Sequence, residues 1–262
     1  MRAGEALRAA AMRIDRLDAE VLLAHLLGVE RGDLILRPEM LVDAAAYEAL
    51  VARRAAGEPA AYIIGSREFW SLDLLVTPAV LIPRPDSETL IEAVMASVQP
   101  RRILDLGTGS GALLLAALSE FPHATGLGID ASAAALAVAK ANAERTGLAG
   151  RAAFQLGDWG AGLGERFDLI LCNPPYVETG AELSRDVRDH EPASALFAGA
   201  DGLADYRRIV PQLPGLLAPG GLAVLEIGWT QAAAVLALGA EAGLNGTVRQ
   251  DLGGRDRAVL LR

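Results

Sequence analysis

The residues with the clearest chemical potential follow an apolar stretch in the second half of the chain. Phe167–Cys172 leads directly into Asn173, Pro174, Pro175 and Tyr176. A proline has no N–H to donate and a φ angle fixed near about −65°, and it pushes a preceding Asn173 into an extended conformation. The resulting corner presents hydrogen-bond acceptors. It suits a substrate group with two hydrogens to donate, such as the planar NH2 of an amide or a nucleobase, and Tyr176 can flank that flat group.

The chemical task at such a corner is to make an amide nitrogen nucleophilic. Its lone pair is delocalised until both hydrogens are held out of plane, here by the Asn173 side-chain oxygen and the Pro174 carbonyl. In-line attack on an activated carbon then needs mostly positioning, which supplies about 7 to 11 kcal/mol when alignment is good. In isolation the tetrapeptide favours an ordinary strand-ending turn, but its place in this chain favours a chemical role.

Three glycines lie between a predicted strand and a predicted helix in the segment "LDLGTGSGA". Gly107, Gly109 and Gly111 permit positive φ angles and let a ligand lie against bare backbone at a helix N-terminus. With Ala112 they also satisfy a dinucleotide-binding pattern, so NAD remains possible. Asp130 ends the next strand, where a carboxylate accepts both hydroxyls of a ribose.

Further residues favour a different nucleoside ligand. Asp105 precedes the first glycine and would repel a pyrophosphate but attract an ammonium or sulfonium group, as in S-adenosylmethionine. Asp158 and Trp159 end the third strand, where an adenine could form hydrogen bonds and pack. Their position is as consistent with surface residues that have no role in binding. Asn173 belongs to the same carboxyl edge of the sheet. We therefore expect S-adenosylmethionine rather than NAD.

The elements that position these residues form an alternating strand and helix pattern. Strands are predicted near 102–106, 125–130, 152–157, 167–172, 222–227, 247–252 and 257–261. Helical segments between the first strands predict a mostly parallel sheet covered on both faces. Only four residues separate the last two strands, which predicts an antiparallel hairpin. The fold class is therefore α/β, a Rossmann-like seven-stranded sheet with a C-terminal antiparallel hairpin and a small N-terminal helical bundle.

Three regions are predicted along the chain. Residues 1–67 have helical periodicity and form the bundle, residues 68–84 form a linking hairpin of two short strands around Thr77–Pro78, and residues 85–262 form the sheet domain. Residues 177–203 lack a sustained period of either kind. Because a long loop beside a candidate site is often functional, we expect a substrate flap there, with a disordered insertion as the alternative.

Composition excludes several classes of protein. The chain has 24 basic and 33 acidic residues, a net charge of −9, which is unfavourable for binding nucleic acid. One cysteine, Cys172, and three dispersed histidines provide neither an internal disulfide nor a zinc-ligand pattern, so no metal is expected. No apolar run approaches the roughly 18 to 20 residues of a membrane helix, and charges interrupt the N-terminal stretch, so we expect a cytoplasmic protein.

Beyond these local patterns, most of the chain resembles the HemK-type protein-glutamine N5-methyltransferases that act on peptide chain release factors. The resemblance is carried by "EPAAYIIGSREFW", "LIPRPDSETLIE", "LDLGTGSGA", "GID", "CNPPYVE", "HEPASALFAGADGL", "LEIG" and "DLGGRDRAVLL". Where the family often has Glu-Thr-Glu after Pro-Arg-Pro, this chain has Asp86, Ser87 and Glu88, a conservative difference.

The resemblance implies a cofactor, a substrate and a partner. S-adenosylmethionine would become S-adenosylhomocysteine, and the N-terminal helices would engage the release factor. Asn173 to Tyr176 would hold the glutamine amide of its Gly-Gly-Gln loop. The implied cofactor-binding residues are Asp105, Gly107, Thr108, Gly109, Ser110, Gly111, Asp130, Asp158, Trp159 and Asn173.

Other functions remain open at this point. A related subfamily methylates glutamine on a ribosomal protein. Nucleic-acid methyltransferases that act on exocyclic amines share the Asn-Pro-Pro-Tyr motif, but the acidic balance of this chain disfavours them. A sensor of S-adenosylmethionine without catalytic activity is disfavoured because Asn173 and Tyr176 are both present. An NAD-dependent oxidoreductase remains as a further alternative.

Overall fold

The computed structural model describes all 262 residues, which separate into two compact units. The N-terminal unit comprises Met1–Ser66 together with Leu183–Glu191. The sheet unit comprises Arg67–Glu182 and Pro192–Arg262. None of the helices is long and apolar enough to cross a membrane.

The N-terminal unit is a bundle of short helices. Its members are α1 (Ala3–Ala10), α2 (Arg16–Leu27), α3 (Arg31–Leu36), α4 (Ala44–Ala55), α5 (Ala60–Ile64) and α9 (Arg185–His190). The Asp15 carboxylate caps α2 by accepting from the Leu17 N–H, and Gly28 ends this helix in a left-handed conformation. In the core the Tyr47 hydroxyl donates to the Ala19 carbonyl at 2.8 Å, so α2 and α4 are joined by a buried hydrogen bond.

The segment predicted as an irregular flap is divided between the two units. Its middle part forms α9, and its last part contains the single 3₁₀ turn η2 (Ala193–Ala195). Arg54 binds Asp18 at 2.5 Å and lies 3.7 Å from Asp186 of the α9 helix. The six residues of α9 are too few to establish a helical period in the sequence, which is why this helix was not predicted.

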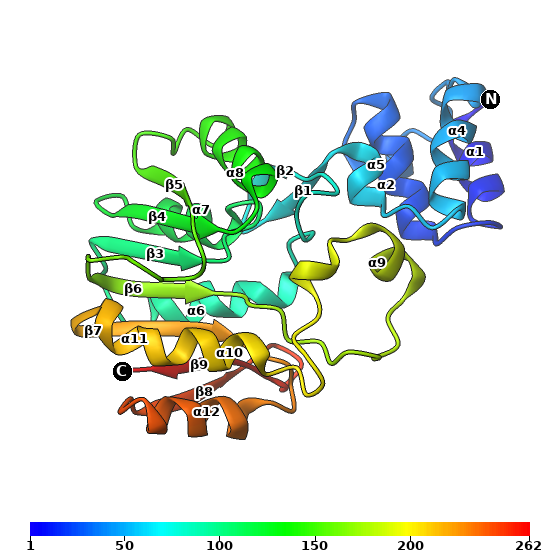
Figure 1. Cartoon of the computed structure of the whole chain (residues 1–262). Helices are drawn as coiled ribbons and strands as arrows, with labels where there is room; N and C mark the ends of the chain where they lie inside the picture. Colours follow the sequence, from blue (N-terminus) through cyan, green and yellow to red (C-terminus); the bar gives the residue numbers. More distant parts are fainter. The chain divides into compact units, whose positions relative to one another are not determined.

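The sheet unit is built on seven strands in the order β5-β4-β3-β6-β7-β9-β8 (Figure 1). They are β3 (Arg102–Leu106), β4 (Thr125–Asp130), β5 (Ala152–Leu156), β6 (Phe167–Cys172), β7 (Leu217–Glu226), β8 (Gly246–Gln250) and β9 (Asp256–Leu261). The first five in this order are parallel, and β9 is antiparallel to both β7 and β8. The predicted fold class, including the C-terminal hairpin, is confirmed.

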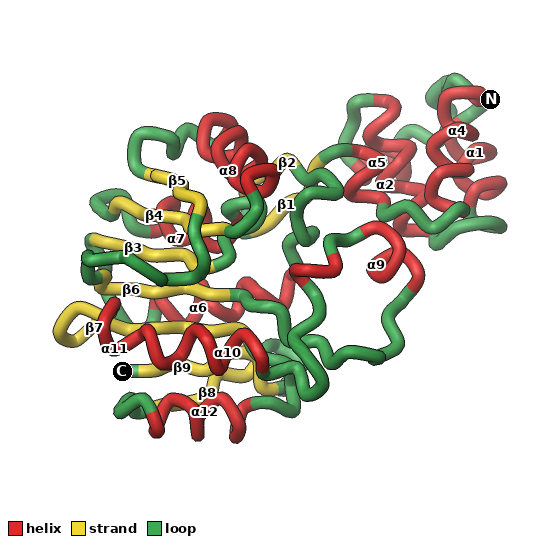
Figure 2. The backbone as a smooth tube through the Cα atoms, in the orientation of Figure 1, coloured by secondary structure: helices red, strands yellow, loops and turns green.

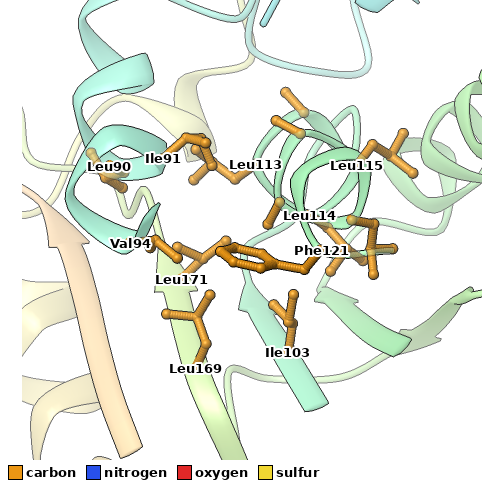
Figure 3. Packing of buried hydrophobic residues seen from close by; sticks show 14 of the residues in the cluster. Leu90, Ile91, Val94, Ile103, Leu113, Leu114, Leu115, Phe121, Leu169 and Leu171 are labelled. Atoms are coloured by element: carbon orange, nitrogen blue, oxygen red, sulfur yellow. The ribbon is translucent and has the colours of Figure 1, made fainter. Parts of the chain in front are cut away.

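Helices cover both faces of this sheet (Figure 2). They are α6 (Glu88–Met95), α7 (Ala112–Glu120), α8 (Ala133–Arg145), α10 (Ala204–Ile209), α11 (Leu213–Leu216) and α12 (Ala232–Glu241), with the 3₁₀ turns η1 (Pro85–Ser87) and η3 (Val210–Gln212). Because successive strand residues point to opposite faces, Ile103 and Leu169 pack under α6 and α7 (Figure 3), whereas Leu104 and Ile170 pack under α10 to α12. Burial on both faces explains why the central strands β3 and β6 are mostly apolar, whereas the edge strands β5 and β8 are largely exposed.

The N-terminal hairpin of the sheet unit differs from its prediction. Its strands are β1 (Ser66–Phe69) and β2 (Leu72–Leu75), so the turn lies at Trp70 and Ser71 and not at Thr77–Pro78. Both turn residues have positive φ angles, 51° and 60°, as a tight two-residue hairpin turn requires. A proline cannot adopt such an angle, and no glycine or asparagine marks the true turn in the sequence. All of residues 68–84 belong to the compact sheet unit.

Candidate active site

A cavity of about 620 Å³ opens at the carboxyl edge of the parallel strands. This is the edge where open α/β sheets bind ligands. Ten of the residues predicted from the sequence line the cavity: Asp105, Gly107, Thr108, Gly109, Ser110, Asp130, Asp158, Trp159, Asn173 and Pro175. Gly111, Pro174 and Tyr176 are not among its lining residues.

The glycine loop connects β3 to α7 and uses each glycine differently. Gly107 has φ +72°, and a Cβ atom there would lie 2.9 Å from Cζ3 of Trp159. Gly109, at φ +54°, has open space around it and donates its N–H to Oδ2 of Asp130 at 2.8 Å. Gly111 caps α7, and a Cβ atom there would lie 3.4 Å from the Ala139 Cβ of α8. The first two glycines therefore shape the cavity, and the third allows close helix packing.

Asp130 at the end of β4 anchors the loop in place. Its second oxygen, Oδ1, accepts the Ser132 N–H at 2.8 Å. A carboxylate oxygen has two lone pairs, so both oxygens of Asp130 keep acceptor capacity for ligand hydroxyl groups.

Asp105 provides an unpaired buried acceptor in the wall of the cavity. Its side chain is 1% exposed, and Oδ2 accepts the Thr108 hydroxyl at 2.6 Å, but Oδ1 has no hydrogen-bond partner. Burial raises the pKa of this carboxyl group to about 7, despite the Thr108 hydrogen bond, which lowers it. A cationic group of a ligand in the cavity would be attracted by the charge of this carboxylate, so the wall of the cavity fits the ammonium and sulfonium groups of S-adenosylmethionine.

Asp158 and Trp159 have protein partners that the sequence did not indicate. Both oxygens of Asp158 accept from Arg208 of α10, at 2.6 and 2.5 Å. Trp159 has φ +52°, packs against Gly107, and hydrogen-bonds through its side chain to Asp205. Arg208 and Asp205 also line the cavity. They come from a helix that follows the motif region by about 30 residues, and no local pattern marks them.

Asn173 is held by a residue from outside its own motif. Its side-chain nitrogen Nδ2 donates to Oγ of Ser87 at 3.3 Å, which leaves the oxygen Oδ1 available at the cavity. Pro175 lines the cavity beside it. The Tyr176 carbonyl accepts from Gln231 at 3.0 Å, which stabilises the corner from behind.

Tyr176 and Ser87 meet at a buried carboxyl group, Glu226 at the end of β7. The Ser87 hydroxyl donates to Oε2 of Glu226 at 2.5 Å, and the Tyr176 hydroxyl donates to Oε1 at 3.3 Å. Burial raises the pKa of Glu226 to about 7 and the pKa of the Tyr176 phenol well above its ordinary value. No function was predicted from the sequence for Ser87 or Glu226, although both lie in segments that carry the family resemblance, "LIPRPDSETLIE" and "LEIG".

Comparison with family models and known proteins identifies both parts of the chain. Residues 1–65 match the model described as PrmC N-terminal domain, and residues 85–190 match the methyltransferase small domain. A release factor glutamine methyltransferase of Rhodospirillum rubrum is 44% identical, with 98% of this chain and 81% of the relative covered. The protein of the same name from Xylella fastidiosa is 46% identical, with 98% and 96% covered.

Solved structures with low sequence identity share the fold. A methyltransferase from Pyrococcus furiosus superimposes with a TM-score of 0.58 at 17% identity, covering 80% of this chain and 95% of its own. A ribosomal protein L11 methylase from Lactobacillus delbrueckii gives a TM-score of 0.51 at 22% identity, covering 68% and 77%. These two similarities support the methyltransferase fold alone.

Proposed function

This chain belongs to the release factor glutamine methyltransferase family, and from that membership we propose its reaction in detail. It is an S-adenosylmethionine-dependent methyltransferase that methylates a glutamine of release factors. The acceptor atom in our proposal is the side-chain amide nitrogen, N5, of the glutamine in the Gly-Gly-Gln loop.

The residues that would hold S-adenosylmethionine lie on three strand ends of the sheet unit. Asp130 would accept the ribose hydroxyls, and the backbone of the glycine loop would lie against the ligand. The carboxylate of Asp105 in the cavity wall would attract a cationic group, and Trp159 would pack near the adenine. When bound, the cofactor supplies a methyl carbon activated by the positive charge of its sulfonium.

The chain's own contribution to the chemistry is at Asn173 and Pro174. The available Oδ1 of Asn173 would accept one hydrogen of the glutamine amide, and the Pro174 carbonyl would accept the other. Holding both hydrogens would localise the lone pair on nitrogen. The nitrogen would then take the methyl group as the carbon–sulfur bond breaks, with its electron pair left on sulfur, and one amide proton would pass to water.

The observation that carries this proposal is the orientation of Asn173. Its nitrogen is engaged by Ser87, and its oxygen remains available at the cavity whose wall also contains the carboxyl group of Asp105. One acceptor for an NH2 group and one for a cation are thus present in a single cavity. This is the combination that methylation of an amide by a sulfonium donor requires.

The test is radioactive methyl transfer to a release factor, with mass spectrometry to locate the modified residue. We expect one methyl group on the glutamine of the Gly-Gly-Gln loop, and none on an acceptor in which that glutamine is alanine. Asn173→Ala should abolish transfer while S-adenosylmethionine still binds in calorimetry. Methylation elsewhere on the release factor, or transfer only to a ribosomal protein, would refute the substrate assignment. Tight, salt-sensitive retention of RNA or DNA would favour a nucleic-acid substrate.

We further propose that the N-terminal unit binds the body of the release factor. Ile35 and Leu36 of α3 and Leu41 after it are 75%, 79% and 80% exposed, which is unusual for large apolar side chains. Leu36→Glu should raise KM for intact release factor and leave methylation of a short Gly-Gly-Gln peptide unchanged. The matched control is Leu252→Glu, at a leucine that is 98% exposed on the sheet unit. An equal effect of both changes would contradict this role.

A further inference from the structure

We propose that the carboxylate of Glu226 orients the side-chain amide of Asn173 through the hydroxyl of Ser87. This inference rests on the proposed function of Asn173 and adds two positioning residues to it. Neither Glu226 nor Ser87 needs to touch the glutamine or the methyl group.

The three side chains form a continuous hydrogen-bonded relay between distant parts of the chain. Glu226 is 1% exposed and Ser87 is 3% exposed, so water does not compete for the contact between these two residues. The 2.5 Å contact between Ser87 and Glu226 joins residues 139 positions apart, and the 3.3 Å contact between Asn173 and Ser87 joins residues 86 positions apart. The relay therefore exists only in the folded sheet unit.

The direction of this relay follows from counting protons. A serine hydroxyl has one hydrogen to donate, and an ionised carboxylate can only accept. While Glu226 is ionised, the hydrogen of Ser87 is committed to it, and only lone pairs of Ser87 face Asn173. The Asn173 amide must then present its NH2 to Ser87 and its oxygen Oδ1 to the cavity, which is the orientation that an amide substrate needs.

Loss of the charge on Glu226 removes this constraint. A protonated Glu226 can donate to Ser87, whose own hydrogen is then free to turn toward Asn173. The Asn173 amide could then rotate by about 180°, because its two ends differ little in size and are distinguished only by their hydrogen bonds. In the rotated state the NH2 group of Asn173 would face the NH2 group of the substrate. Because both are hydrogen-bond donors, Asn173 could not hold the substrate amide.

Several groups around Glu226 influence its charge. Burial, with a smaller contribution from the charge of Asp86 of η1, raises the pKa of Glu226 to about 7, against the opposing effects of the Ser87 hydrogen bond and of Arg257 of β9. Tyr176 donates to the carboxylate, while the Tyr206 hydroxyl of α10 donates only to the backbone carbonyl of Glu226, at 2.6 Å.

The remaining group that interacts with this carboxylate is the buried thiol of Cys172 on β6, whose pKa is raised well above its ordinary value. Within this cluster Glu226 is the group whose pKa is raised to about 7. The Asp105 carboxyl in the cavity wall also has a pKa of about 7, so only an acid limb that depends on Ser87 is assigned to Glu226. A group whose neutral form is inactive and whose pKa is about 7 should make kcat fall as pH is lowered through 7.

The experiment measures kcat, KM and their pH dependence for methylation of an intact release factor between pH 6 and 9. Ser87→Ala interrupts the relay, and we expect kcat to fall about tenfold, the size of one lost orienting hydrogen bond, with the acid limb near pH 7 lost. Ser87→Thr keeps the hydroxyl and should restore both kcat and the acid limb. Glu226→Gln should behave as Ser87→Ala does, since an amide does not commit the hydroxyl of Ser87 to one direction.

Tyr206→Phe is the matched control, because it deletes a buried hydrogen bond to the same residue without touching the carboxylate or Ser87. It should lower the melting temperature and leave the pH profile of kcat as in the unmodified protein. Calorimetry with S-adenosylmethionine checks that each variant is folded, and if Glu226→Gln does not fold, the Ser87→Ala and Ser87→Thr pair decides alone.

The outcomes separate this inference from the proposed function. If the unmodified protein does not methylate the glutamine amide, the proposed function fails first. If it does, but Ser87→Ala binds S-adenosylmethionine and keeps both kcat and the acid limb, the relay is refuted. An equal loss in Ser87→Ala and Ser87→Thr would show a packing role and would also refute the relay.

Discussion

Replacing Asn142 should destabilise the sheet unit by more than any single surface change. Asn142 lies on α8 and is 0% exposed. Its Oδ1 accepts the Leu75 N–H at 2.7 Å, and its Nδ2 donates to the Leu75 carbonyl at 3.0 Å and to the Ser110 carbonyl at 2.9 Å. One side chain thus joins the end of β2 to the glycine loop of the candidate active site.

The magnitude follows from these three bonds. A typical hydrogen bond contributes about 0.5 to 1.5 kcal/mol net, and a buried polar group left without a partner costs about 1 to 3 kcal/mol. The bond to Ser110 is fully buried, whereas those to Leu75 are partly buried, so water can replace only the latter. Asn142→Ala should therefore lower the free energy of unfolding by about 3 kcal/mol. In a domain of this size that corresponds to a fall of roughly 6 to 12 °C in Tm.

Urea unfolding and thermal melting of the full chain measure this loss, and calorimetry with S-adenosylmethionine measures its effect on the glycine loop. Asn142→Asp should be at least as damaging, because its oxygens face two carbonyl groups that now lack a donor. Lys140→Ala, at an exposed position of the same helix, should change stability by less than about 0.5 kcal/mol. A loss below about 1 kcal/mol in Asn142→Ala would mean that water takes over all three bonds, and the reasoning would be wrong.

Three other changes test separate features. Gly107→Ala adds a Cβ 2.9 Å from the tryptophan ring described above, so it should weaken S-adenosylmethionine binding more than about tenfold in calorimetry. Gly147→Ala, with the same φ of +72° and open space, should not weaken this binding. Burial raises the pKa of the Asp105 carboxyl from 3.8 to about 7. Between these two pH values the folded protein keeps the proton and the unfolded chain loses it. The free energy of unfolding should therefore fall as pH rises from about 4 to 7. In Asp105→Asn, the melting temperature should fall less over the same pH interval. Finally, Arg54→Ala should speed proteolysis within Leu183–Glu191, because Arg54 holds that segment in the N-terminal unit.

Much of the fold could be predicted because the relevant signals are local. The central strands are mostly apolar runs, and glycine or acidic residues mark the ends of β3, β4, β5 and β7. The short linker Asp251–Arg255 could close only an antiparallel hairpin, and β8 and β9 form it. The first hairpin was placed wrongly because its turn at Trp70 and Ser71 carries no glycine, asparagine or proline. There the backbone angles result from tertiary packing and not from residue preference.

The candidate site could be predicted only in part, for a related reason. Residues of the glycine loop and of the Asn-Pro-Pro-Tyr corner could be predicted from their types and spacing, and most of them line one cavity. Arg208, which pairs with Asp158, is 50 positions away from it in sequence, and no motif marks this arginine. The roles of the individual residues toward cofactor and substrate stay predictions.

The sequence by itself determined the order and type of the strands, the acceptor character of the proline corner, and the placement of its motifs at one edge of the sheet. These depend on residue chemistry and on spacings of a few positions. Only the tertiary structure decided which way Asn173 faces, because Ser87 and Glu226 reach it from other strand and helix ends. A hydrogen bond between residues far apart in the chain depends on where folding brings them, and no local pattern encodes that position.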